Sequence, residues 1–305
     1  MRKLASILAP LLFLACGRDP AAPVGVIAAD REHHGGGVVI HVATGSWDIY
    51  VYDAKSRTTT QASTISGADE WNAAFSNDGR SIVHEVIGSH DLYVTRISTG
   101  VSRPLAGGEG GNDADWSPNG RLIAFDGDFG DPNLYVLPAS GGTRKLVRVM
   151  AMDPPWGPDS HHLVFRDHSD YTVRTIDLRS GSEQVVAGFG LNPAWSTDGR
   201  RIAYSDGYNI LVVAVNVAGA AVGAPVQVTS DPYGAFINQE PSWSSDGRTI
   251  LFSSNRSGTD FDVWVVKSSG GEPTRLFGTV GEGDYDPTFY GNTLVAFSKF
   301  TPPSP

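Results

Sequence analysis

Apolar and polar residues alternate along this chain in short runs, and turn residues separate the runs. Examples are "RLIAF" at 121–125, "PNLYVLP" at 132–138 and "TILFSS" at 249–254. A period of two predicts β-strands, whose successive side chains point to opposite faces of a sheet, whereas a helix would show a period near 3.6. Gly and Pro contribute 36 and 19 residues, which fits many tight turns. We therefore expect an all-β protein.

One unit recurs six times: an aromatic anchor, a turn of the Ser-Pro-Asp-Gly kind, and an apolar strand. The copies are "AAFSNDGRSIVHEV" from Ala73, "ADWSPNGRLIAFDG" from Ala114, "PPWGPDSHHLVFRD" from Pro154, "PAWSTDGRRIAYSD" from Pro193, "PSWSSDGRTILFSS" from Pro241 and "PTFYGNTLVAFSKF" from Pro287. The anchors, spaced by 41, 40, 39, 48 and 46 residues, are Phe75, Trp116, Trp156, Trp195, Trp243 and Phe289. Strand-forming repeats of this length predict a β-propeller with four-stranded antiparallel blades, whose anchors pack between blades.

The two ends of the chain are expected to complete one blade together. The segments "WDIYVYD" from Trp47 and "RTTTQAS" from Arg57 are later strands without a first strand, whereas 286–300 supplies an opening pair without outer strands. Joining them closes the ring and protects its strand edges. This predicts a six-bladed propeller over residues 38–300 and a tail at 301–305. Because 38–43 and 294–300 both resemble second strands, a seventh, incomplete blade is the alternative.

The first sixteen residues, "MRKLASILAPLLFLAC", predict export. Two basic residues precede an apolar core, as in a secretory signal peptide over 1–15. Cys16, the only cysteine, follows "FLA", which resembles a lipoprotein cleavage site with Phe13 in place of the usual Leu. We expect lipidation of Cys16, a flexible tether over 16–37, and attachment to a bacterial membrane in the periplasm or at the cell surface. An ordinary signal peptide cut nearby is the alternative.

Charge narrows the choice of partner. The formal net charge is −10, and removal of the signal peptide leaves 21 basic against 33 acidic side chains, or about −12. Nucleic acid is excluded as a partner, because phosphate binding requires a basic surface that this composition lacks. We expect a monomer that recognises a protein or basic peptide of the cell envelope and contacts the membrane only through its lipid.

The repeat unit, an aromatic followed by Ser-Pro-Asp-Gly-Arg, apolar positions and then Asp-Ile/Leu-Tyr-Val, resembles the WD-type repeat of the TolB β-propeller family. The resemblance covers residues 38–300 and implies the fold. It leaves function open, because this repeat occurs in adaptors, sensors and the propeller halves of exopeptidases. TolB also carries an amino-terminal domain where this chain has the tether, so no role of that domain is carried over. Two copies depart from the pattern, with Ser160 in place of Gly and "FYGNT" in place of the turn.

No catalytic motif is found. The chain has no Gly-x-Ser-x-Gly elbow, and "HEVIGSH" at 84–90 has Gly88 where a zinc-binding motif requires its second His, so His84, Glu85 and His90 are expected on the blade surface. In "DGDFGD" at 126–131, Asp126, Asp128 and Asp131 suit Ca²⁺ chemically, but their spacing departs from the EF-hand pattern. A solvated hairpin is the preferred interpretation. We expect no cofactor, with Ca²⁺ as the one candidate.

One constellation comes from the repeat itself. Three residues before every anchor stands a carboxylate or an amide: Asn72, Asp113, Asp153, Asn192, Glu240 and Asp286. Because the first strand of each blade lines the channel of a propeller, these residues are expected to form a ring near one mouth. The structural alternative is that the side chains cap local turns and satisfy backbone N–H groups.

Three functions follow from such a ring. In a binding module, the acidic mouth attracts a basic partner while loop aromatics such as Phe129, Tyr233 and Phe236 anchor it. In a calcium-dependent, lactonase-like propeller hydrolase, channel residues would hold the metal. In a structural scaffold, the channel would only hold water. The even spacing of the ring favours the binding module, and the long loop at 229–239 is the expected place for a specific contact.

Overall fold

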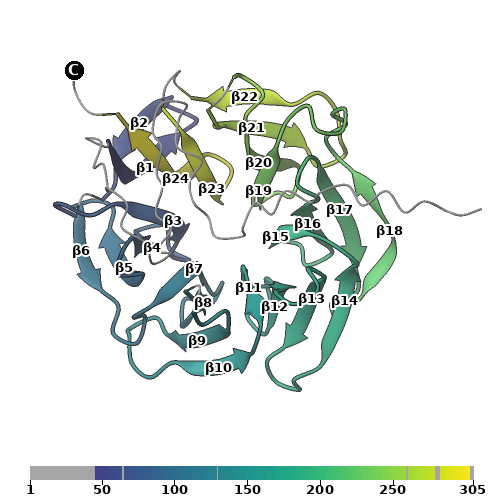
Figure 1. Ribbon diagram of the computed structural model, residues 1–305, viewed down its shortest axis with the longest axis horizontal. Coiled ribbons are helices and arrows are strands. Elements are labelled where there is room, and N and C mark those ends of the chain that lie inside the picture. The colour runs from purple at the N-terminus through teal and green to yellow at the C-terminus, as the bar shows by residue number, and fades with distance from the viewer. Residues whose placement is uncertain (1–44, 64, 129, 259, 279–281, 303–305) are drawn as a thin grey trace, which may run out of the picture.

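Six four-stranded antiparallel sheets surround a central axis in the computed structural model (Figure 1). The structure describes residues 45–302 except 64, 129, 259 and 279–281. These residues confirm the predicted six-bladed propeller, and the seven-bladed alternative is wrong for them. The signal peptide, Cys16, the tether, residues 38–44 and Phe129 lie outside the described residues.

The blades are numbered here from the first complete one, and each is written from its innermost strand outward. Blades 1 to 3 comprise β3 (Glu70–Phe75), β4 (Ser81–Val86), β5 (Asp91–Arg96) and β6 (Val101–Pro104); β7 (Gly111–Trp116), β8 (Leu122–Gly127), β9 (Leu134–Pro138) and β10 (Lys145–Arg148); and β11 (Ala151–Met152), β12 (His162–Asp167), β13 (Val173–Asp177) and β14 (Glu183–Ala187). Blades 4 to 6 comprise β15 (Leu191–Trp195), β16 (Arg201–Ser205), β17 (Ile210–Val215) and β18 (Ala221–Gln227); β19 (Asn238–Trp243), β20 (Thr249–Ser254), β21 (Asp262–Lys267) and β22 (Thr274–Phe277); and β23 (Asp284–Tyr290), β24 (Leu294–Thr301), β1 (Ser46–Asp53) and β2 (Thr58–Gln61).

Blade 6 closes the ring as predicted. β1, from the amino-terminal part of the chain, pairs along its whole length with β24, from Ser46 opposite Thr301 to Asp53 opposite Leu294. The two outer strands of this blade therefore come from the beginning of the chain and the two inner strands from its end. This closure pairs edges that would otherwise be open to other chains.

In four blades, hydrogen bonds of the serine side chain stabilise the Ser-x-Asx-Gly turn. In blade 2, the Ser117 hydroxyl donates to Oδ1 of Asn119 (3.0 Å) and accepts the backbone N–H of Leu122 (2.9 Å). The same two bonds recur from Ser76, Ser196 and Ser244. The repeated motif is thus explained by local hydrogen bonding at the end of the channel where each innermost strand finishes.

Each junction between blades has its own apolar cluster, and the aromatic anchors belong to these clusters. Trp243 of blade 5 is buried among Ala203 and Val212 of blade 4, and its indole N–H donates to the carbonyl of Ala194 (3.1 Å). Trp156 of blade 3 donates in the same way to blade 2. The anchors are not equally buried, since Trp116, Trp195 and Phe289 are only partly covered.

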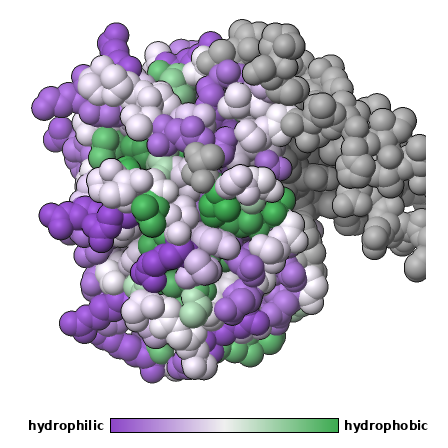
Figure 2. Space-filling model, turned by 90° about the vertical axis from the view of Figure 1, so that its left-hand side faces the viewer, coloured by the Kyte–Doolittle hydropathy of each residue, from purple (hydrophilic) through white to green (hydrophobic). Residues whose placement is uncertain are grey.

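The rim of the propeller carries the outermost strands. Every side chain of β2 is exposed and polar, and β6 ends in Arg103 and Pro104, residues that discourage pairing with another strand. On the rim around blade 1, hydrophobic side chains lie in separate groups among polar ones (Figure 2). The described part of the chain contains no helix with the length and hydropathy needed to cross a bilayer.

The junction between blades 6 and 1 contains a buried polar network beside its apolar cluster. His84 and Glu70 are fully buried, and Glu85 is also buried, so the expectation that His84 and Glu85 lie on the blade surface is wrong. The hydroxyl of Ser63 donates to Oε1 of Glu70 (2.5 Å), and Nε2 of His84 lies 2.8 Å from Oγ1 of Thr95. In the other five blades an aromatic residue occupies the position of His84. This histidine therefore brings hydrogen-bonding groups into an otherwise hydrophobic layer.

Burial sets the protonation of this pair. Loss of hydration raises the pKa of Glu70 to about 7 and lowers the pKa of His84 to about 4. Below about pH 6 the carboxyl of Glu70 therefore keeps its proton, and the imidazole of His84 is neutral above about pH 4. Although Nδ1 of His84 lies 3.6 Å from Oε1 of Glu70, the two groups are consequently not an ion pair under mildly acidic conditions.

We predict that Trp243→Ala lowers the free energy of unfolding by about 3–5 kcal/mol, because it empties a buried indole site between two blades. Urea unfolding followed by fluorescence or circular dichroism measures this loss. The matched control is Trp195→Ala, whose indole is only partly buried and whose loss should be smaller. Equal losses for the two variants would contradict the unequal roles of the anchors.

We predict that Glu70→Gln flattens the dependence of stability on pH. Because the pKa of Glu70 is higher in the folded chain than in the unfolded one, its contribution to stability is complete below about pH 4.5 and is lost as the pH rises through about 7. Wild type should therefore lose up to about 3 kcal/mol more than the variant between pH 5 and 8. Denaturant titrations across this range, with exposed Glu272→Gln as the control, test this. Parallel curves for all three proteins would show that Glu70 ionises normally.

Candidate functional site

Six polar residues, one from each blade, share a rare backbone conformation. Their φ angles lie between 46° and 56°, in the left-handed region; they are Asn72, Asp113, Asp153, Asn192, Glu240 and Asp286. These are the six residues that the repeat predicted as a ring, and they are called the ring residues below. Asn and Asp enter the left-handed region more readily than most residues, which explains why these two types fill five of the six positions.

A β-bulge places the ring residue in five of the six blades. In blade 1 the pairing of β3 with β4 shifts between Trp71 and Ala74, and Asn72 lies within that shift. Equivalent shifts occur in blades 2, 4, 5 and 6, whereas in blade 3 the innermost strand stops at Met152, just before Asp153. A bulge redirects a side chain and leaves a residue outside the ladder. Proline follows the ring residue in four blades, where the missing N–H removes no ladder bond.

All six ring residues line one cavity at the centre of the propeller, with a volume of about 230 Å³. Its walls also include the anchors Trp156, Trp195 and Trp243. In five blades the ring residue is the second or third residue of the innermost strand, in blade 3 it directly follows β11, and the cavity wall continues from the ring residues to the anchors. One end of the channel is where the innermost strands begin. We call this end the ring mouth; it is formed by the loops that join second to third strands and fourth strands to the next blade.

A second polar ring lies behind the first, and the sequence interpretation missed it. It consists of the second-strand residues that pair opposite the residue preceding each ring residue: Glu85, Asp126, Arg166, Ser205, Ser253 and Ser298. All six are buried. The signal in the sequence was a polar residue directly after the aromatic or His of each second strand, which apolar runs such as "TILFSS" conceal.

Side chains of one blade satisfy the backbone of the next. The N–H of Asn72 donates to Oγ of Ser298 (3.1 Å), and the N–H of Asp153 donates to Oδ2 of Asp126 (3.1 Å). The N–H of Asp286 likewise donates to Oε2 of Glu240 (2.8 Å). Among these three acceptors only Glu240 is a ring residue, and its bond joins neighbouring blades instead of capping a local turn.

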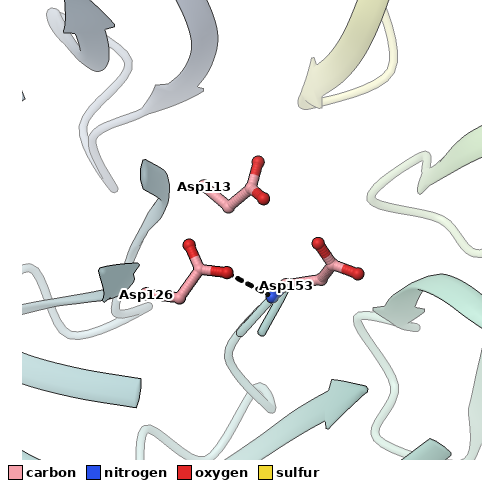
Figure 3. A group of neighbouring side chains, drawn as sticks. All are labelled: Asp113, Asp126 and Asp153. Carbon is pink, nitrogen blue, oxygen red and sulfur yellow. Dashed lines mark hydrogen bonds between the residues drawn. The ribbon is translucent and has the colours of Figure 1, made fainter. Parts of the chain in front are cut away.

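Three carboxylates of the two rings come close together. Oxygens of Asp113, Asp126 and Asp153 lie within 4.8 Å of one another, as Figure 3 shows. Oxygen ligands of this kind suit Ca²⁺. However, the buried guanidinium of Arg166 contacts Oδ2 of Asp153 at 2.9 Å. Because this cation already compensates part of the negative charge, the cluster has the composition of a buried charge network as well as that of a metal site.

The three Asp residues that the sequence suggested as a Ca²⁺ site do not lie together. Asp126 joins Asp113 and Asp153, while Asp128 and Asp131 lie in the loop between β8 and β9. There, Oδ1 of Asp128 accepts the N–H of Gly130 (3.0 Å), and Asp131 accepts the hydroxyl of Tyr135 (2.8 Å). Within the described residues, Asp126, Asp128 and Asp131 do not form a group of metal-ligand size.

The long loop at 229–239 lies at the ring mouth, and polar contacts of Asp231 fix its position. Asp231 forms an ion pair with Arg256, accepts a hydrogen bond from Asn238 (2.9 Å), and its N–H donates to Oδ1 of Asn209 (3.0 Å). Arg256 also lies 5.3 Å from the ring centre of Phe236. Phe236 is thereby partly covered, whereas Tyr233 remains exposed.

The chain has the fold of a six-bladed β-propeller, and TolB structures are among the solved structures that resemble it. The structure resembles that of a putative TolB from Agrobacterium tumefaciens, with a TM-score of 0.70, 21% sequence identity, and coverage of 85% of this chain and 100% of that one. TolB from Acinetobacter baumannii aligns with a TM-score of 0.58 at 17% identity, over 80% of this chain and 66% of that one.

The same fold also occurs in an enzyme. Oligogalacturonate lyase from Vibrio parahaemolyticus aligns with a TM-score of 0.50 at 14% identity, over 76% of this chain and 73% of that one. By sequence, no family model and no curated protein matches this chain. The fold alone therefore leaves both binding and catalysis open.

We predict that the stability of a variant at a ring position depends on how readily the new residue adopts a positive φ. Asp113→Asn should change the free energy of unfolding by no more than about 0.5 kcal/mol, because Asn occupies two equivalent positions. Asp113→Val should cost about 1–3 kcal/mol, because a β-branched residue is strained at a φ of 48°. Urea unfolding of both variants measures the difference. If Asn and Val variants unfold at the same urea concentration, the left-handed conformation is not a constraint there.

Proposed function

We propose that this protein is a recognition module whose ring mouth binds a basic peptide segment of a partner protein. The observation that carries the proposal is the ring: four carboxylates and two amides face one cavity at the centre of the fold. The two rings together contain six carboxylates and one guanidinium, that of Arg166, and Asp115 adds a further carboxylate to the cavity wall. An excess of one charge in a concave site attracts ligands of the opposite charge.

Several ring carboxylates already have partners within the protein. Glu240 accepts hydrogen bonds from Ser253 (2.8 Å) and Gln239 (2.9 Å), and Asp153 is paired with Arg166. These bonds fix the positions of the oxygens before a ligand arrives. Preorganised acceptors bind a cation with little loss of side-chain freedom, which favours recognition of Lys or Arg.

The proposal includes export and attachment to a bacterial membrane through Cys16. Its support is the signal-like sequence of residues 1–16, which lie outside the described residues. The described chain adds one relation: β1 begins at the ring mouth, since Ser46 pairs with Thr301 at the end of β24. The tether would therefore join the propeller at the end that carries the ring.

We predict that a fluorescein-labelled peptide of alternating Lys and Gly binds the purified mature protein, and that Asp113→Asn combined with Glu240→Gln weakens binding about tenfold or more. Fluorescence anisotropy at low and high ionic strength measures the affinity, which should fall as salt screens the charges. Glu272→Gln is the matched control, because it removes one carboxylate from the exposed turn between β21 and β22, at the opposite end of blade 5.

Three outcomes would overturn the binding module. Equal affinity in the ring variant and the Glu272→Gln control would remove the ring from recognition. Absence of peptide binding by wild type would favour the scaffold. One-to-one calcium binding measured by calorimetry, and lost in Asp126→Asn, would instead put the metal-dependent hydrolase first, because Asp126 joins Asp113 and Asp153.

A further inference from the structure

The ring mouth is not equally apolar around its circumference. Among the described residues, its large exposed hydrophobic side chains lie in only three loops; they are Val149 (51% exposed), Met150 (37%), Phe189 (47%) and Tyr233 (84%). These loops lead consecutively into blades 3, 4 and 5. We call these four residues the apolar arc. The other large exposed hydrophobic residues of the described chain lie on outermost strands or, for Val217, in a turn at the opposite end of blade 4.

Neighbouring aromatic side chains support the arc. The ring of Phe189 stacks on that of Tyr171 with centroids 6.2 Å apart, and the ring of Tyr233 contacts that of Tyr208 at 4.2 Å. Each supporting tyrosine belongs to the loop between the second and third strands of the blade that precedes the arc loop: Tyr171 in blade 3 and Tyr208 in blade 4. Phe189 and Tyr233 are therefore each paired with a tyrosine, and each pair exposes a larger apolar surface than an isolated residue would.

Backbone hydrogen bonds between loops hold the arc in place. The N–H of Met150 donates to Oδ1 of Asn133 (3.0 Å), and its carbonyl accepts the N–H of His168 (2.8 Å). The N–H of Gly190, next to Phe189, donates to the carbonyl of Tyr171 (3.0 Å). Surfaces that are fixed in this way lose little entropy on binding.

The arc adjoins the ring. Met150 precedes the ring residue Asp153 by three positions, and Phe189 precedes Asn192 by three. Three residues of extended chain span about 10 Å, so an apolar side chain on the arc and a charge in the channel lie within reach of one short peptide.

We infer that the apolar arc is the specificity surface of the ring mouth, and that its occupant is a basic segment of a partner protein in which large apolar side chains alternate with Lys or Arg. The inference rests on the proposed function, which supplies the charge complementarity. Apolar side chains of the segment pack on Phe189 and Tyr233, and an adjacent cation enters the channel. Exposed aromatic residues beside a polar site are frequent anchors of protein interfaces.

Two labelled peptides test this. The first is the alternating Lys and Gly peptide, and in the second Trp replaces two of the glycines. Wild type should bind the second peptide about tenfold more tightly, and Phe189→Ser combined with Tyr233→Ser should abolish that gain while leaving the affinity for the first peptide unchanged. Val217→Ser is the matched control, since Val217 is 97% exposed at the opposite end of blade 4. Urea unfolding verifies that the variants are folded.

The outcomes separate this inference from the proposed function. If the first peptide binds through the ring but Trp adds no affinity, or the gain survives in the arc variant, the arc inference fails alone. A gain lost equally in Val217→Ser would also overturn it. A further result is that wild type binds only the Trp peptide, with an affinity that the arc variant loses and the ring substitutions leave unchanged. That result would support the arc and overturn the ring as the site that binds the charge. No binding of either peptide would overturn both.

Discussion

The left-handed residue in each innermost strand is the constraint on which the channel depends. Six strands converge at the axis, and a regular strand there would keep its N–H groups within the ladder and its side chains in simple alternation. The bulge turns one side chain per blade toward the cavity and releases one N–H from the ladder. A released N–H in a buried wall requires an acceptor, which the preceding blade supplies through Ser298, Asp126 and Glu240. Backbone geometry thereby makes the centre of the propeller polar.

This origin explains why structural and functional roles coincide in the same side chains. Glu240 accepts the N–H of Asp286 from the next blade and also lines the cavity, so the same carboxylate stabilises a junction between blades and contributes to the candidate site. Arg166 shows the limit of this arrangement. Where three carboxylates converge, a buried guanidinium contacts Asp153, because uncompensated buried charges are costly. The net negative charge of the channel is therefore the charge of its carboxylates less that of Arg166, and the side chains that carry it belong to the strands of the channel wall.

The sequence predicted what the repeat makes periodic. The blades, the closure and the six ring positions recur at a fixed place in every unit, so comparing the units found them. The second ring also recurs, but its members range from Ser to Arg, and only the strand register reveals their common place. His84 was misplaced because period-two patterns do not tell a polar residue on a solvated face from one inside a junction. Asp126 was grouped with Asp128 and Asp131 by proximity in sequence, whereas its actual neighbours, Asp113 and Asp153, come from different strands.

The features that distinguish this propeller lie where the six-fold pattern is broken. Ring geometry is nearly uniform, with φ angles within ten degrees of one another, so the ring alone offers a ligand six similar approaches. Loops are free of that constraint, because they lie outside the strand ladders and can differ in length and composition. Here three consecutive loops carry the exposed apolar side chains of the ring mouth, and the remaining described loops of that mouth do not. Charge at the centre can attract a basic segment from any side, but among the described loops only this sector offers large exposed apolar side chains. Orientation must therefore come from the loops and not from the repeat.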